Sequence, residues 1–332
     1  MHMGDFMLSP AVGGTIMTAA VGTAAVSIKK VRDMDEKKIP LMGVMSAFVF
    51  AAQMINFTIP GTGSSGHLAG AIMLSILLGP YAGFLSIAAI LLIQALFFAD
   101  GGLLAYGCNV INMGFFACFI AYPLIYRTIT KKGLTRTRLM TGSILSSVAA
   151  LQMGAFSVVI QTLLSGKTEL PFTQFALAMQ GIHLAIGAVE GVVTAAVVSF
   201  VWKVRPDIIN TEPSEKSKKQ GYKSVIIGFL VAAVLLAGGI SLFASANPDG
   251  LEWSIGKVAG DKEIKGETQV HKSLEKAQQD IAVLPDYSFK KQENADESMG
   301  TVVSGLVGSG ITVGLVLVAG YLIKLIKRKK AK

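Results

Sequence analysis

The sequence predicts an all-α integral membrane protein with about nine transmembrane helices. Of its 332 residues, 52% are hydrophobic and only 15% are charged, and the mean hydropathy is +0.57. Soluble domains are usually far more charged than this. Long stretches without Lys, Arg, Asp or Glu recur along the chain, and most of them reach the roughly 20 residues that a crossing helix needs. The bilayer is therefore the expected solvent.

The stretch 39–99 is free of charged side chains and too long for a single crossing, so it must fold back on itself. Helix breakers at Pro60 and Gly79 divide it into three pieces. The middle piece, 67–78, is too short to cross unaided. Irregular backbone at membrane depth must be buried in protein or line a cavity, so we expect the Gly- and Ser-rich loop before His67 to dip inward. The expected crossings are 8–28, 40–59, 67–78, 81–99, 105–126, 139–164, 172–202, 224–245 and 301–323.

The basic residues predict the orientation of these crossings. With the N-terminus outside and the C-terminus in the cytoplasm, the cytoplasmic segments hold 22 of the 30 Lys and Arg, as the positive-inside rule requires. The long polar segment 246–300 then lies outside, with eleven Asp and Glu against seven Lys. No basic patch interleaved with aromatic residues indicates nucleic-acid binding, so the net charge of +9 reflects membrane orientation. The cytoplasmic segments are 29–38, 127–138, 203–223 and 324–332.

Three parts follow along the chain. Residues 1–205 form a seven-helix block, 206–223 a Lys- and Glu-rich cytoplasmic linker, and 224–332 a two-helix module that carries the outer segment. Cys108 and Cys118 lie within one apolar stretch, where a buried free thiol is the usual form. We expect a multi-pass protein of the cell membrane without a disulfide.

The N-terminus is a candidate chelator of a metal ion. An initiator Met is removed only before a small residue, so ahead of His2 we expect Met1 to keep a free amine. That amine, the His2 backbone nitrogen and the His2 ring Nδ1 can close five- and six-membered chelate rings, and His67 on the same outer side is the candidate fourth ligand. Square-planar nitrogen coordination favours Ni(II) or Cu(II), imidazole also accepts Co(II), and Mg and Ca prefer oxygen. The alternatives are a floppy terminal His and a hydrogen-bonded core His.

Four polar residues are candidates for supporting roles. His183 and Glu190 are seven residues apart on one helix face. Intramembrane ionisable residues are functional candidates, and this pair can form an ion path, support the ligands or clamp helices together. Asp100 and Asn109 flank a Gly-Gly turn, where they can orient a ligand His or cap helices. His271 lies in the polar outer segment without ligand spacing, and we expect it to be solvated.

The motifs of common enzyme classes are not found. The sequence holds no Ser/His/Asp, His-Glu-x-x-His or Cys-x-x-Cys set, so we expect a transport subunit without an organic cofactor. Gly61 and Gly66 have Walker A spacing, but His67 and Leu68 replace the required Lys and Ser/Thr. ATP hydrolysis is therefore expected in separate subunits.

Several motifs fall in a familiar order over about 200 residues. They are Met1-His2 with Leu8-Ser9-Pro10, Ser65-Gly66-His67-Leu68, Asp100-Gly101-Gly102-Leu103, Asn109-Val110-Ile111-Asn112-Met113-Gly114 and His183-Leu184-Ala185-Ile186-Gly187-Ala188-Val189-Glu190-Gly191. Together they resemble the CbiM/NikM family, the substrate-binding membrane subunits of energy-coupling factor (ECF) ABC transporters for cobalt and nickel. The remainder is similar to a fused NikN/CbiN-type subunit, with the PDGLE signature at Pro248-Asp249-Gly250-Leu251-Glu252.

The resemblance implies a metal site of Met1, His2 and His67, with Ni(II) or Co(II) as the transported substrate and nickel preferred. It also implies a CbiQ/NikQ-like membrane coupling subunit and CbiO/NikO-like cytoplasmic ATPase subunits as partners. The C-terminal module would be an accessory to transport outside the ligand set. The alternative function is a stand-alone secondary transporter or channel for divalent metal, with His183 and Glu190 as an ion relay.

Overall fold

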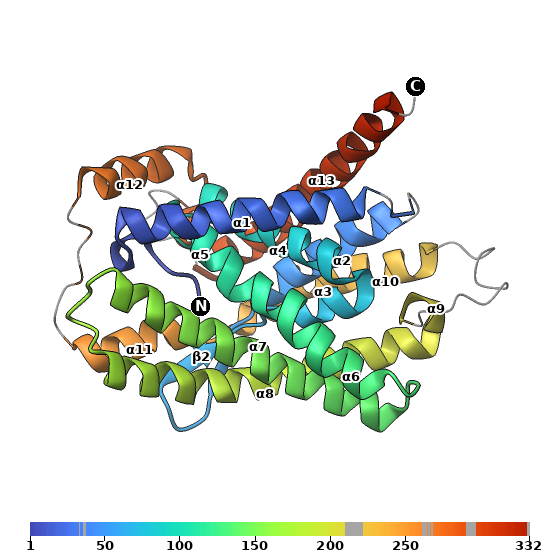
Figure 1. Cartoon of the computed structure of the whole chain (residues 1–332), viewed down its shortest axis with the longest axis horizontal. Coiled ribbons are helices and arrows are strands. Elements are labelled where there is room, and N and C mark those ends of the chain that lie inside the picture. The colour runs from blue at the N-terminus through green and yellow to red at the C-terminus, as the bar shows by residue number, and fades with distance from the viewer. Residues whose placement is uncertain are drawn as a thin grey trace.

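The computed structural model is mostly helical, and the two ends of the chain lie far apart (Figure 1). Most of the expected linker, residues 210–221, lies outside the described residues. The structure describes residues 1–32, 34–35, 38–209, 222–260, 264, 266, 268–289 and 297–330.

Within the described chain, six helices are long and apolar enough to cross a membrane. Polar caps and prolines define where they begin: Ser9 accepts a hydrogen bond from the Val12 N–H directly before Pro10, and Thr135 caps in the same way. The long helices are α1 (Pro10–Val31), α4 (Pro80–Phe97), the continuous run of α5 (Tyr106–Val110), a π-helix (Ile111–Tyr126) and α6 (Arg127–Thr130), α7 (Arg136–Leu164), α8 (Phe172–Val204) and α13 (Glu297–Lys330).

The helices have a common direction that gives the molecule two distinct ends. In Figure 1, α1, α7 and α8 run close to the horizontal long axis, and α7 packs along α8. The N-terminus, α11 (Gly250–Ala259) and α12 (Gln269–Ile281) lie toward the left end. The C-terminus, α6 and α9 (Pro206–Ile209) lie toward the right. Elements of the expected outer and cytoplasmic segments thus separate to opposite ends.

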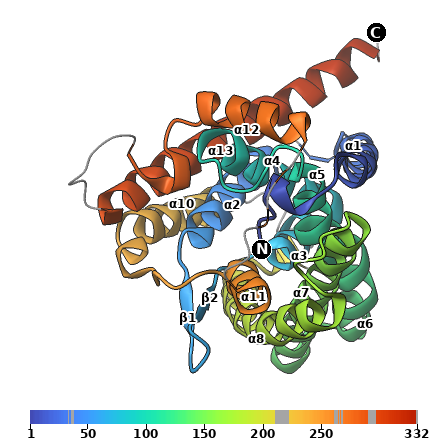
Figure 2. The same ribbon diagram turned by 90° about the vertical axis from the view of Figure 1, so that its left-hand side faces the viewer.

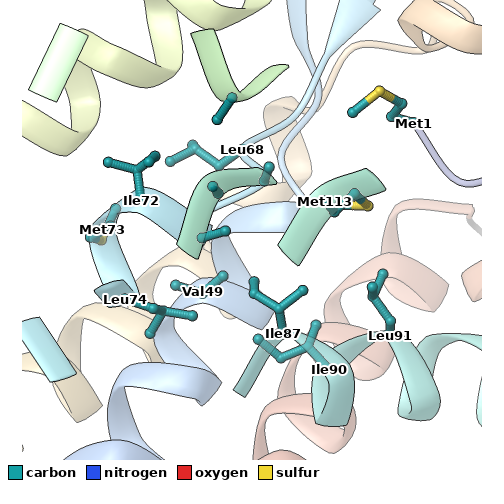
Figure 3. Packing of buried hydrophobic residues seen from close by; sticks show 14 of the residues in the cluster. Met1, Val49, Leu68, Ile72, Met73, Leu74, Ile87, Ile90, Leu91 and Met113 are labelled. Atoms are coloured by element: carbon teal, nitrogen blue, oxygen red, sulfur yellow. The ribbon is translucent and has the colours of Figure 1, made fainter. Parts of the chain in front are cut away.

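Two shorter apolar helices join the parts of the chain. Helix α2 (Lys38–Gln53) packs against α10 (Lys223–Gly238) and α13, so the C-terminal module shares its core with the N-terminal block. The piece expected at 67–78 is helical only in α3 (Ala71–Leu78), and seven of its eight residues are buried. Buried Met, Leu and Ile side chains from α3 and α4 fill the interior (Figure 3).

The expected crossing at 40–59 ends early, because helix α2 stops at Gln53. The chain then forms an antiparallel hairpin of β1 (Phe57–Ile59) and β2 (Ser64–Gly66). Gly61 and Gly63 in its turn have positive φ angles of 77° and 74°, which glycine adopts without steric cost. Hydropathy alone does not separate a buried hairpin from the end of an apolar helix.

The expected outer segment contains two amphipathic helices, α11 and α12. The expectation that His271 is solvated is wrong, since its side chain lies in α12 and is buried against the N-terminal block. Its Nε2–H donates to the Leu8 carbonyl at 2.8 Å, and its Nδ1 accepts from the Thr268 N–H at 3.3 Å. A polar helix can still bury a histidine when both ring nitrogens find partners.

Candidate metal centre

The first residues of the chain enter the middle of the helices instead of extending into solvent (Figure 2). The Met3 N–H donates to Asn109 Oδ1 at 2.8 Å, and its carbonyl accepts from Asn109 Nδ2 at 3.2 Å and from the Gly102 N–H at 2.9 Å. Met3 is fully buried, and the Met1 side chain lies beside Met113 (Figure 3). Both backbone groups of residue 3 are therefore held, which fixes the position of the chain end.

The turn after Asp100 makes room for this segment. Asp5 Oδ1 accepts a hydrogen bond from the Ala105 N–H at 2.9 Å. A Cβ at Gly102 would lie 2.5 Å from the Asp5 backbone nitrogen, so only glycine fits there. The Gly-Gly turn seen in the sequence thus serves the close approach of two backbones.

The loop that carries His67 is held from α8. Glu190 Oε2 accepts from the Ala69 N–H at 2.9 Å and Oε1 from the Gly70 N–H at 3.1 Å. His67 Nδ1 lies 3.1 Å from the Leu68 carbonyl. A carbonyl oxygen only accepts, so Nδ1 carries the proton and His67 Nε2 has a free lone pair.

Three potential donor atoms meet at the end of this loop. The Met1 amine nitrogen lies 3.3 Å from His67 Nε2 and 2.7 Å from Asp249 Oδ2, and the latter two atoms are 3.8 Å apart. Burial acts to raise the pKa of Asp249, but the Met1 ammonium and His67 together outweigh burial and hold that pKa well below its usual range. The carboxylate is therefore ionised and pairs with the chain end.

His2 lies beside these atoms, between His67 and Asp100. Its ring stacks on the His67 ring with the centroids 5.2 Å apart and the planes at 14°. Its Nδ1 is 3.4 Å from Asp100 Oδ1, and its Nε2 is buried without a hydrogen-bond partner among the described residues. Burial lowers the pKa of His2 to about 4, against a smaller opposing effect of Asp100. The ring is thus neutral at pH 7, the form that binds metals.

Asp100 is oriented by the C-terminal module. The Tyr287 hydroxyl donates to Asp100 Oδ2, and the Tyr287 ring stacks on Phe98 with centroids 4.9 Å apart. Burial, with Asp100 as a further cause, raises the pKa of Tyr287 well above its usual value, so the hydroxyl keeps its proton and donates. Asp100 is left with one oxygen toward His2.

His183 lies next to the Met1, His67 and Asp249 side chains, on the face of α8 that also carries Glu190. Its Nδ1 is 2.8 Å from the Met179 carbonyl, so by the same reasoning its Nε2 has the free lone pair. That nitrogen would lie 3.3 Å from a Cβ at Gly250, the first residue of α11. His183 shares a small enclosed cavity with Met1, His67 and Asp249.

A larger cavity of about 420 Å³ is lined by His2 and His67 together with residues of the expected outer segment. The N-terminal block and the C-terminal module both line it. Its carboxylates would attract a cation toward the two imidazoles. They belong to Asp100, Asp249, Glu252 and Asp286.

The arrangement offers nitrogen donors of the kind that divalent transition metals prefer. Among the described residues, no three His, Cys, Asp or Glu side chains are spaced to hold a metal ion by themselves. The terminal amine of Met1 is a further nitrogen donor, 3.3 Å from His67 Nε2. The sequence singled out Met1, His2 and His67, and the structure brings them together.

The structure gives the other expected residues distinct places. Asp100 faces His2, whereas Asn109 holds the backbone one residue further on and Glu190 holds the loop of His67. Reasoning from the sequence missed Asp249 as a neighbour of the site. A signal was present, because Asp249 and Glu252 have the spacing of a capping box and so indicate the start of a helix.

Comparison with known proteins gives matches to both parts of the chain. The family model of the cobalt uptake substrate-specific transmembrane region, CbiM, matches residues 2–208, and that of the PDGLE domain matches residues 223–325. The fused nickel transport protein NikMN of Rhodobacter capsulatus is 30% identical, and the match covers 96% of this chain and 97% of that protein. The cobalt transport protein CbiM of Sorangium cellulosum is also 30% identical, over 52% of this chain and 76% of that protein.

The N-terminal block also resembles solved structures. A crystal structure of a truncated transition metal transporter superposes with a TM-score of 0.54 at 33% sequence identity. The match covers 61% of this chain and 99% of that one. The similarity in sequence thus extends over both parts of the chain, whereas this solved structure matches 61% of it.

Proposed function

The chain belongs to the family of CbiM cobalt-uptake transmembrane regions, here fused to a PDGLE domain, and we propose that it captures nickel or cobalt ions for import, with nickel preferred. The observation that carries this proposal is the approach of the Met1 amine to His67 Nε2 at 3.3 Å, with the His2 ring stacked alongside. A chain-end nitrogen held beside two imidazole rings is a donor set of the kind that nickel and cobalt accept.

The proposed ligands are the Met1 amine, the His2 backbone nitrogen, His2 Nδ1 and His67 Nε2. An all-nitrogen square suits nickel better than cobalt, and fused relatives of full length are named as nickel transport proteins. In the metal-free structure His2 Nδ1 faces Asp100. One ring nitrogen cannot serve both partners, so the ring must release Asp100 when it binds the ion.

Four residues position these ligands in the proposed mechanism. Asn109 fixes the chain end, Glu190 fixes the His67 loop, Asp100 orients His2, and His183 fills the space beneath. Such supporting residues commonly change metal affinity by roughly 10- to 100-fold. A relay through His183 and Glu190 is not favoured, because both Glu190 oxygens accept hydrogen bonds from the His67 loop.

The proposed topology has nine crossings, the six long helices together with α2, α3 and α10. The N-terminus and the segment 246–300 lie outside and the C-terminus lies in the cytoplasm, consistent with the two ends of the molecule in Figure 1. The proposed parts are the metal-binding domain 1–205, the linker 206–223 and the module 224–332.

Transport would require partners of two kinds. A membrane coupling subunit and cytoplasmic ATPase subunits would supply the energy of ATP hydrolysis, as in ECF-type transporters. The run from Gly61 to Gly66, with its Walker A spacing, forms the turn and second strand of a hairpin that leads to His67. Vesicles holding this chain together with both partner types should take up nickel when supplied with ATP, whereas vesicles holding this chain alone should not.

The decisive test measures metal binding to the purified full chain. We expect His67→Ala, or one residue added before Met1, to abolish tight binding of Ni(II) and Co(II), because each change removes a nitrogen donor. One residue added after Lys332 is the matched control and should bind as the parent does. Mass spectrometry should find a free amine on Met1. Unchanged affinity in both ligand variants would refute the proposed site.

A further inference from the structure

Asp249 belongs to the C-terminal module, yet its carboxylate lies among the proposed ligands of the N-terminal block. Its Oδ2 is 2.7 Å from the Met1 amine nitrogen and 3.8 Å from His67 Nε2. The latter two atoms are 3.3 Å apart. A single point in the plane of the three atoms lies about 2 Å from each of them, the usual length of a bond from a transition metal to nitrogen or oxygen. An ion at that point would contact all three atoms, and the His2 nitrogens would then move toward it to complete the set.

The carboxylate is placed there by two independent anchors. Asp249 Oδ1 caps α11 by accepting from the Leu251 and Glu252 N–H groups at 2.8 and 2.9 Å, which leaves Oδ2 free for another partner. The residues just before it are fixed to β2, where the Ser65 N–H donates to the Pro248 carbonyl at 2.8 Å. A side chain so constrained loses little conformational freedom when it binds an ion.

We propose that Asp249 is an oxygen ligand of the transported ion, so that the C-terminal module contributes directly to the metal site. The inference rests on the proposed function and goes beyond it, since the module would otherwise lie outside the ligand set. In the structure the carboxylate pairs with the Met1 ammonium. On binding, the amine releases a proton to solvent and the metal replaces the ammonium as the partner of Asp249.

A fifth donor of this kind has a consequence for selectivity. Low-spin Ni(II) is satisfied by four nitrogens in a plane, whereas Co(II) gains more from an added oxygen. The carboxylate thus widens the range of metals that the site accepts. Its negative charge also offsets part of the charge of the ion in a buried place.

Two substitutions separate the ligand role from the helix cap. Asp249→Ser and Asp249→Asn both keep a side chain that caps helices well, so α11 retains its first turn. Both remove the negatively charged oxygen. Asp280→Ser is the matched control, because it removes an exposed carboxylate from α12 of the same module. Equilibrium titration with Ni(II) and with Co(II) gives the affinities, and X-ray absorption of the loaded protein gives the number of nitrogen and oxygen ligands.

We expect Asp249→Ser to weaken Co(II) binding by roughly 10- to 100-fold and Ni(II) binding by less. X-ray absorption of Asp249→Ser should show one nitrogen or oxygen ligand fewer than in the parent. Asp280→Ser should match the parent in both metal affinity and ligand number. If Asp249 only balances the ammonium charge, its removal frees the amine, and binding stays the same or becomes tighter. Either of those results overturns the inference, as does an unchanged ligand number. Loss of binding in His67→Ala alongside such a result would leave the proposed function intact.

Discussion

The N-terminal block and the C-terminal module meet at the metal site, but they are held there in different ways. In the block, one buried side chain fixes each ligand-bearing segment: Asn109 holds the chain end and Glu190 holds the loop of His67. Besides the packing of α10 and α13 on α2, the module makes hydrogen bonds to the block at several points between residues 245 and 278. They run from Ser245 to Asn56, Pro248 to Ser65, Trp253 to Thr62, His271 to Leu8, and Gln278 to Ala95 and Gly101.

The block and the module should therefore differ in how far a single substitution disturbs the proposed metal site. Loss of one residue in the block should release a whole ligand segment, whereas loss of one contact in the module leaves several others in place. Each hydrogen bond of this kind contributes little to the free energy of docking, and the remaining ones keep the module in place when one is lost. Loss of a docking contact in the module should therefore change metal affinity less than loss of an anchor in the block.

The largest effect is expected for Asn109→Ala. It removes the partner of both backbone groups of Met3 in a buried place, which frees the chain end and should weaken nickel binding by roughly 100-fold. Asn56→Ala, which changes an asparagine in the lining of the outer cavity, is the control and should bind nearly as the parent does. An affinity for Asn109→Ala as little changed as that expected for Trp253→Phe would remove the distinction between the block and the module.

An intermediate effect is expected for Glu190→Gln. The amide keeps one acceptor oxygen but turns an NH₂ group toward the backbone N–H of Ala69 or Gly70, so one hydrogen bond is replaced by repulsion. Nickel affinity should fall by roughly 10-fold. Glu169→Gln, in the turn before α8, provides the comparison. A parent-like titration curve for Glu190→Gln would mean that the His67 loop keeps its shape without this anchor.

The smallest effect is expected for Trp253→Phe in the module. It removes one hydrogen bond from Nε1 to the Thr62 carbonyl at 2.9 Å, worth about 1 kcal/mol for a neutral pair. Nickel affinity should change by less than about fivefold, and thermal unfolding of the purified protein should report the lost bond. A drop as large as that of Asn109→Ala would show that the module depends on single contacts after all.

The main features of the fold could be predicted because each long helix carries its own signal. Charge-free stretches and breakers such as Pro80 depend only on neighbouring residues, so they can be read locally. The hairpin at Ile59 and the burial of His271 could not be read in this way. The hairpin strands lie within an apolar stretch that hydropathy does not distinguish from a helix, and the burial of His271 depends on the Leu8 carbonyl, a partner far along the chain.

Part of the candidate site could also be predicted from the sequence, because some of its residues carry a local signal. Met1 and His2 form a chelator by their chemistry alone, whatever surrounds them. The approach of Asp249 has no such local signal, because its partner is 248 residues away. A capping box indicates where a helix begins and says nothing about what the free carboxylate oxygen faces.

The long sequence separation between Met1 and Asp249 also determines when their contact can form during synthesis. The hydrogen bonds of the His67 loop cannot form until Glu190 is synthesised, about 120 residues later. The contact between the Met1 amine and Asp249 can form only later still. Contacts so distant in sequence form slowly and only after the intervening helices are in place. The contacts of Met1 and of the His67 loop thus belong to the last part of the molecule to be completed.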